Sequence, residues 1–73
     1  MSGFVIVYNR LTRESHVTSF PGDEGYREAF TERMRLEAEN TDPDLEIVSL
    51  VSDSLDSAKA THSRYFEHVV TAV

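Results

Sequence analysis

Phe4-Val5-Ile6-Val7-Tyr8 is an uninterrupted run of β-branched and aromatic side chains near the start of the chain. Such residues favour strands, and a run without polar alternation is typical of a strand that is covered on both faces. Asn9 and Arg10 end the run. We therefore expect a strand at the centre of a sheet, in which either the alternate set that begins at Phe4 or the set that begins at Val5 faces the helices.

A second strand is predicted at residues 15–20, joined to the first by a hairpin connection through residues 9–13. Its sequence, Ser-His-Val-Thr-Ser-Phe, is much more polar than that of the first strand. One solvated face is expected of a strand at the edge of a sheet. Pro21 and Gly22 then end the strand.

A helix is predicted from Asp23, as N-cap, to about Glu39, because the polar segment 40–44 breaks the pattern there. Its buried stripe is expected to comprise Tyr26, Ala29, Phe30, Met34 and Leu36. The charged residues Arg33 and Glu37 fall inside that stripe, where an unpaired buried charge would be costly. We interpret this pair as the edge of a partner-binding site, with both charged groups held at the rim.

The third strand is predicted at residues 45–51, which mix apolar positions on both faces. Ser52-Asp53-Ser54 then offers alternative N-caps for a last helix, which is expected to continue through Val70 while residues 71–73 fray. The apolar stripe of this helix comprises Leu55, Ala58, His62, Tyr65, Phe66, Val69 and Val70.

The element order β-β-α-β-α predicts a single small α+β domain over residues 1–73. A right-handed crossover through the first helix places the third strand beside the first, which gives a three-stranded antiparallel sheet of order 2-1-3. Both helices are expected to pack on one face of this sheet. The other face would then be bare, and a chain of 73 residues without cysteine has little other support for its core. Pairing of two copies is the simplest way to cover such a face.

The net charge of −6 arises in the middle of the chain, because residues 36–58 contain seven acidic residues and no basic residue. We call these seven the acidic belt: Glu37, Glu39, Asp42, Asp44, Glu46, Asp53 and Asp56. Such a belt favours a basic protein partner and disfavours direct binding of nucleic acid. The residues predicted to bind the partner are Arg33, Glu37, Glu39, Asp42, Asp44 and Glu46.

A candidate pocket is predicted around His62 and Tyr65, which lie on one side of the last helix. A partly buried imidazole that bonds a carbonyl or a tyrosine hydroxyl explains the position of His62 more simply than acid–base chemistry does. Neither the histidines nor the serines have the spacing of metal ligands or of a catalytic motif. We therefore expect no metal, no cofactor and no catalytic residue.

Arg10 and Arg13 flank the hairpin next to Tyr8, and an arginine-bearing ribbon beside an aromatic residue is one way to bind nucleic acid. Two arginines are a small footprint, because useful affinity for a phosphate backbone normally needs several contacts. Solvated loop arginines are the simpler interpretation.

The sequence as a whole predicts a cytoplasmic protein that binds another protein and forms a homodimer. The apolar run near the N-terminus has no preceding positive residue and is too short for a signal peptide or a membrane span. Two alternatives stay open. The acidic belt could imitate phosphates and occupy a nucleic-acid-binding protein, or a small enzyme could assemble a site from His62, Tyr65 and Arg33 across a dimer.

Overall fold

The apolar run forms the middle of strand β1 (Ser2–Asn9) in a computed structural model that describes residues 1–73. β1 lies between β2 (Glu14–Phe20) and β3 (Leu45–Ser52) and is antiparallel to both. The prediction that the first strand is central is confirmed, and these three strands have the predicted order. Phe4, Val5 and Ile6 are each at most 2% exposed, so both faces of β1 are covered.

A fourth strand, β4 (His68–Ala72), pairs in parallel with β2 and makes the sheet mixed, with the order β3-β1-β2-β4. The predicted three-stranded antiparallel sheet is therefore wrong, and β2 is not an edge strand. The last helix was predicted to reach Val70, but α2 (Leu55–Thr61) ends early and is followed by the 3-10 turn η1 (Ser63–Phe66). The β-branched residues after η1 instead extend along β2, where they satisfy its outer backbone groups.

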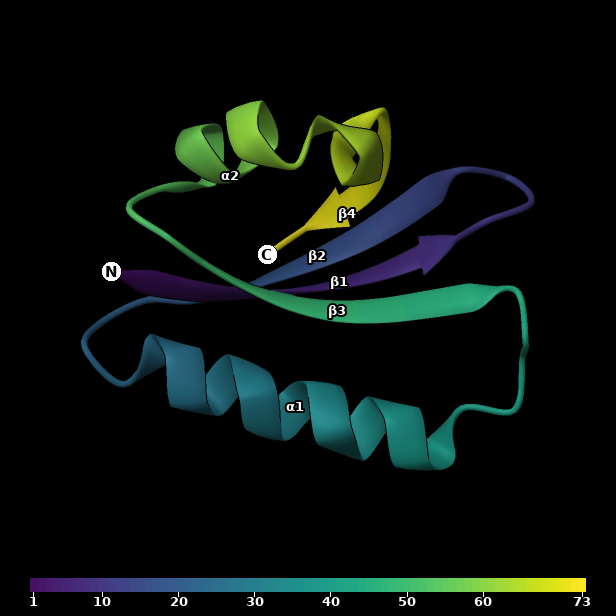
Figure 1. Cartoon of the computed structure of the whole chain (residues 1–73), viewed down its shortest axis with the longest axis horizontal. Coiled ribbons are helices and arrows are strands. Elements are labelled where there is room, and N and C mark those ends of the chain that lie inside the picture. The colour runs from purple at the N-terminus through teal and green to yellow at the C-terminus, as the bar shows by residue number, and fades with distance from the viewer.

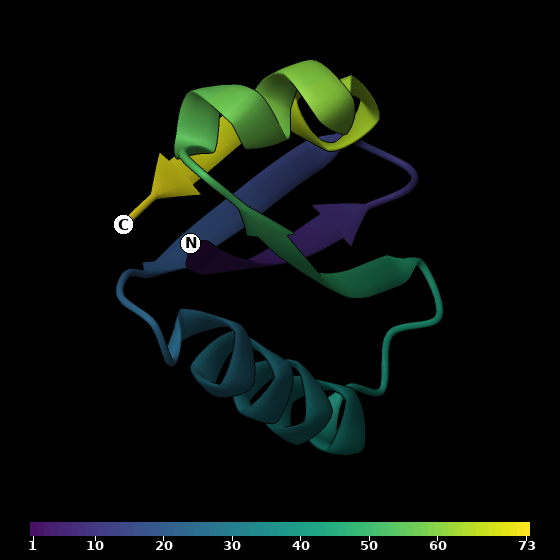
Figure 2. The ribbon, with the colours of Figure 1, turned by 60° about the vertical axis from the view of Figure 1, so that its left-hand side comes forward.

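The two helices lie on opposite faces of the sheet, as Figures 1 and 2 show. α1 (Gly25–Glu39) covers one face, and α2 with η1 covers the other. The prediction that both helices pack on one face is wrong. The chain leaves β3 at one edge of the sheet and crosses β1 and β2 through α2 and η1, on the face opposite α1, to reach the position of β4 at the other edge. The bare sheet face that suggested self-association is therefore absent.

The two alternate sets of side chains on β1 face different helices. Those beginning at Phe4 join a core beneath α2 and η1, whose buried members are Phe4, Ile6, Tyr8, Val17 and Ala58. Gly3 lies on the other face, against the start of α1. A Cβ atom on Gly3 would overlap the carbonyl oxygen of Gly25, and one on Gly25 would overlap that of Phe20. The two glycines thus let α1 begin in direct contact with the sheet.

Only part of the predicted stripe of α1 is buried. Ala29 is fully buried and Leu36 partly so, whereas Tyr26, Phe30 and Met34 are about half exposed. The reason is that α1 packs mainly on β1 and β3, at one side of the sheet. The helix begins after Glu24 rather than after Asp23, and no side chain caps it.

Candidate functional site

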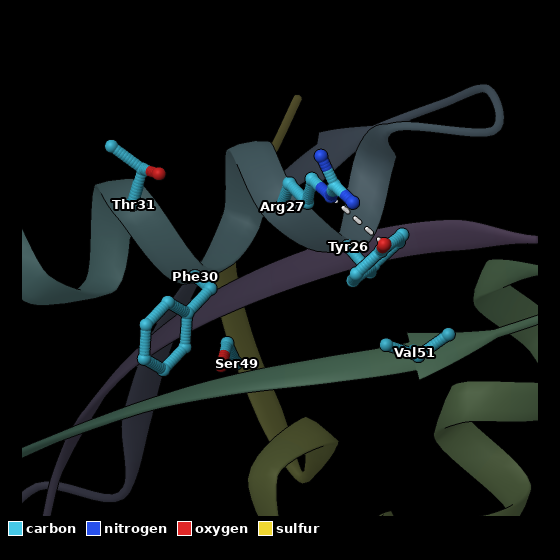
Figure 3. Close-up of a pocket in the computed structure, with 6 residues that line it drawn as sticks. All are labelled: Tyr26, Arg27, Phe30, Thr31, Ser49 and Val51. Carbon is cyan, nitrogen blue, oxygen red and sulfur yellow. Dashed lines mark hydrogen bonds between the residues drawn. The ribbon is translucent and has the colours of Figure 1, made fainter.

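An apolar groove lies between α1 and β3, which forms one edge of the sheet (Figure 3). Its lining comprises Tyr26, Arg27, Phe30, Thr31, Ser49 and Val51. In Figure 3, Phe30 projects from α1 toward β3 near Ser49, and Tyr26 projects toward Val51. The Tyr26 hydroxyl accepts a hydrogen bond from Arg27 Nε (2.9 Å). Phe30 and Val51 are each 52% exposed, so the groove leaves apolar surface in contact with water.

The backbone of β3 has free hydrogen-bonding groups along this groove. The N–H of Arg10 donates to the carbonyl oxygen of Asp44 (2.9 Å), and this bond sets the alternation of the ladder between β1 and β3. Residues an even number of positions from Asp44 direct their backbone groups to β1. The intervening residues direct theirs away from the sheet: Ile47, Ser49 and Val51, and also Leu45, whose N–H donates to the carbonyl oxygen of Asp42 (3.3 Å) and is therefore not free.

β3 also lacks the features that usually protect an edge strand. Its eight residues pair with β1 without a break, and they include no proline and no lysine. The opposite edge strand, β4, has five residues and an irregular register at Ser15 and His16. Short strands and bulges discourage pairing with another chain. β3 is therefore the edge that is more open to an additional strand.

A second feature is a polar pocket that we call the arginine pocket, lined by Tyr8, Arg10, Arg13, Arg64 and Glu67. Arg10 and Arg13 come from the connection between β1 and β2, and Arg64 comes from η1. The long interval between them in the sequence is bridged only when η1 folds over the sheet.

Glu46 on β3 holds two of these arginines in place. Its Oε1 atom accepts hydrogen bonds from Arg10 Nε (3.3 Å) and from Arg64 Nη2 (3.0 Å). Its Oε2 atom accepts a hydrogen bond from the Tyr65 hydroxyl. The Arg64 guanidinium also lies over the rings of Tyr65 (5.0 Å) and Tyr8 (5.4 Å). These contacts fix the orientation of Arg64 although its side chain is 59% exposed.

The ionisation of this cluster follows from the same contacts. The hydrogen bond from Tyr65, together with those from Arg10 and Arg64, holds the pKa of Glu46 below its usual value despite partial burial. The hydrogen bond to Glu46 and burial raise the pKa of Tyr65. Glu46 is therefore charged and Tyr65 is neutral at neutral pH, which keeps the Tyr65 hydroxyl a donor.

The predicted partner-binding residues on α1 are Arg33, Glu37 and Glu39, and only Arg33 contacts a residue of the groove. Arg33 and Glu37 form an ion pair (2.5 Å) in which their side chains are 37% and 44% exposed. The Arg33 guanidinium is 5.9 Å from the centre of the Phe30 ring. Glu39 pairs instead with Arg35 (3.0 Å).

The remaining acidic residues are spread over the molecule. Asp42 and Asp44 lie in the connection from α1 to β3, whereas Glu46 is bound within the cluster described above. Asp53 and Asp56 lie beyond the other end of β3, roughly 25 Å away at the usual rise of a strand. The acidic belt therefore does not form one continuous surface in a single copy.

His62 and Tyr65 do not form a shared pocket. His62 caps the C-terminus of α2, is partly exposed and makes no side-chain hydrogen bond, whereas Tyr65 contacts Glu46 and Arg64. Arg33 lies on α1, across the sheet from both. His16 Nδ1 is 2.7 Å from Thr71 Oγ1 on β4, and no group of three acidic or histidine side chains could hold a metal ion.

Comparison with known proteins found no family model, no curated protein and no solved structure that matches this chain. No helix of the structure is both long enough and apolar enough to cross a membrane. The groove beside β3 and the arginine pocket are therefore the two features from which a function can be inferred.

Proposed function

We propose that this chain is a small cytoplasmic interaction module that forms a homodimer through antiparallel pairing of β3 with β3 of a second copy. The long, unprotected edge of β3 is the observation that carries this proposal. Pairing would supply partners for the outward backbone groups of β3 and would bring two grooves together.

A second copy fits this edge because an antiparallel pair of identical strands is two-fold symmetric. A pair centred on Ser49 would set Ile47 opposite Val51 of the partner subunit and would bring the two Phe30 rings near the axis. The charges also permit it. Glu46 is the only charged residue of β3, and Arg10 and Arg64 compensate it, so the two edges would not repel each other although each chain carries −6.

The exposed area indicates a reversible dimer. Tyr26 and Phe30 are 46% and 52% exposed, which corresponds to roughly 100 Å² each for side chains of this size. With Met34 and Val51 the apolar area stays below the roughly 800 Å² per partner of a standard interface. Backbone hydrogen bonds would therefore supply much of the affinity, and we expect dissociation on the order of micromolar concentration.

Sedimentation velocity of matched lysine variants tests this arrangement. Val51→Lys places a charge in the groove at a side chain that is 52% exposed, and Leu11→Lys makes the same change in the exposed β1–β2 turn. We expect the wild type and Leu11→Lys to form dimers at micromolar concentration and Val51→Lys to be monomeric, with equal circular dichroism spectra. A wild type that is monomeric up to millimolar concentration, or a dimeric Val51→Lys, would refute the pairing.

Ser49→Pro supplies a second variant that does not rely on charge. The N–H of Ser49 points away from β1, so proline at this position removes an outward donor and leaves the ladder between β1 and β3 intact. The dimer should dissociate more readily than that of Ser49→Ala, which keeps the donor.

For a heterologous partner we propose a protein with a basic surface that binds Glu37, Asp42 and Asp44. These residues lie near the C-terminal end of α1 and in the connection that follows. The phosphate-imitating alternative needs a continuous acidic surface, and the separation of Asp53 and Asp56 from the others favours the smaller patch instead.

A further inference from the structure

The arginine pocket gathers positive charge on a chain whose net charge is −6. Arg10, Arg13 and Arg64 face two carboxylates, Glu46 and Glu67, so one positive charge is left uncompensated. The pair between Arg13 and Glu67 is long, at 3.7 Å, and its two side chains are 70% and 54% exposed. Water weakens such a pair, so Arg13 is free to turn toward another anion.

Tyr8 provides an unused polar group in the same pocket. The residue is only 5% exposed, and its hydroxyl makes no hydrogen bond within the chain. Ser15 Oγ is the only fully buried side-chain oxygen without a partner, so the Tyr8 hydroxyl is not sealed inside the core. A nearly buried hydroxyl that lacks a partner is costly unless water or a ligand satisfies it. Tyr8 thus offers a donor among the residues that line the pocket.

The guanidinium groups around this donor are already oriented. Glu46 and two tyrosine rings hold Arg64, and Glu46 with the carbonyl oxygen of Pro43 (3.5 Å) holds Arg10. Each group retains unused N–H donors, because these contacts occupy only some of its nitrogens. A planar guanidinium that is held in place loses little freedom when it binds a phosphate or carboxylate.

We propose that the arginine pocket binds the phosphoryl group of a small phosphate monoester. Three converging arginines and a tyrosine hydroxyl match the several oxygens and the double charge of such a group better than the single charge of a carboxylate. A nucleic-acid backbone fits less well, because Glu67 lines the pocket and would repel the neighbouring phosphates.

Amide chemical shifts in NMR titrations with inorganic phosphate and phenyl phosphate test this site, with benzoate and a single-stranded oligonucleotide as comparison ligands. We expect saturable shifts confined to residues 8–13 and 64–67, with dissociation constants on the order of 1 mM for inorganic phosphate. The proposal would be overturned if neither inorganic phosphate nor phenyl phosphate gave saturable shifts. Tighter binding of benzoate would reassign the site to carboxylates, and tighter binding of the oligonucleotide would reassign it to nucleic acid.

Three variants separate the pocket from general charge effects. Tyr8→Phe removes only the hydroxyl and should weaken phosphate binding several-fold. The circular dichroism spectrum of the free protein should stay unchanged. Arg64→Gln should weaken it about tenfold or more. Arg35→Gln is the matched control, because Arg35 is as exposed as Arg10, is also ion-paired and lies on α1. Equal losses in Arg64→Gln and Arg35→Gln would show nonspecific attraction and overturn the site.

Discussion

Ile6 shows how much of the stability depends on a single position of β1. It is fully buried and belongs to the core beneath α2 and η1. Ile6→Ala should lower the free energy of unfolding by about 2–5 kcal/mol, because it removes packed methyl groups and leaves a cavity. Urea denaturation measures the change, with Leu11→Ala at a side chain that is 74% exposed as the control. A loss below about 0.5 kcal/mol would contradict burial at Ile6.

Ser15 and Ser54 predict opposite effects of the same substitution. Ser15 Oγ is buried and has no partner, whereas Ser54 Oγ caps α2 by accepting from the N–H of Ser57 (3.1 Å). Ser15→Ala should be neutral or stabilise the fold by up to about 1 kcal/mol, because no unsatisfied hydroxyl is left. Ser54→Ala should destabilise it by about 1 kcal/mol. Denaturation of both variants checks this, and the reverse ranking would show that Ser15 has a partner, such as water.

Glu46 makes the stability depend on pH. The hydrogen bond from Tyr65 and the contacts with Arg10 and Arg64 lower its pKa in the folded state below the ordinary value of 4.5. The stabilisation is therefore complete above that ordinary value and is lost as the pH falls through the folded pKa. Between pH 7 and pH 3 we expect the wild type to lose more unfolding free energy than Glu46→Gln loses, as measured by denaturation across that range. Parallel curves would exclude a role for the carboxylate.

At the scale of elements, the first turn of α1 rests directly on the sheet. Gly25→Ala should cost about 1–3 kcal/mol or more, because its Cβ atom meets the backbone of Phe20, which cannot move without disturbing β2. Gly22→Ala is the matched comparison. No atom lies within reach of a Cβ on Gly22, and its φ of +95° is the only obstacle, which costs about 1 kcal/mol. Thermal denaturation should place Gly25→Ala below Gly22→Ala, and the opposite order would argue against the close approach.

The end of α2 shows why the last segment was predicted wrongly. The apolar positions from Leu55 to Val70 fit a helical period, but the residues after Glu67 are mostly β-branched and fit a strand equally well. The open edge of β2 resolves this ambiguity, because β4 and the residue that follows it satisfy backbone groups there, as in the bond from the N–H of Val73 to the carbonyl oxygen of Val17 (2.9 Å). Local pattern alone contains no information about that distant edge.

At the scale of the whole molecule, the charge distribution predicts which macromolecules bind. The patch formed by Glu37, Asp42 and Asp44 should attract a basic protein, whose association should slow as salt screens the charges. Glu37→Lys should weaken the binding of the basic protein, whereas the melting temperature of the chain should change little. Labelled DNA or RNA, duplex or single-stranded, should bind this protein poorly even at low ionic strength. Submicromolar binding there would contradict the acidic interface and direct attention to Arg10, Arg13, Lys59 and Arg64.

The sequence by itself determined the class of the fold, the central position of β1 and the extent of α1 to Glu39, because each depends on a dense local pattern of apolar residues and breakers. Only the tertiary structure decided that the helices lie on opposite faces, that β4 pairs with β2, and that Arg64 joins Arg10 and Arg13. These features depend on contacts between residues far apart in the chain, whose free energy is gained only when the sheet edge and the helices are already in place.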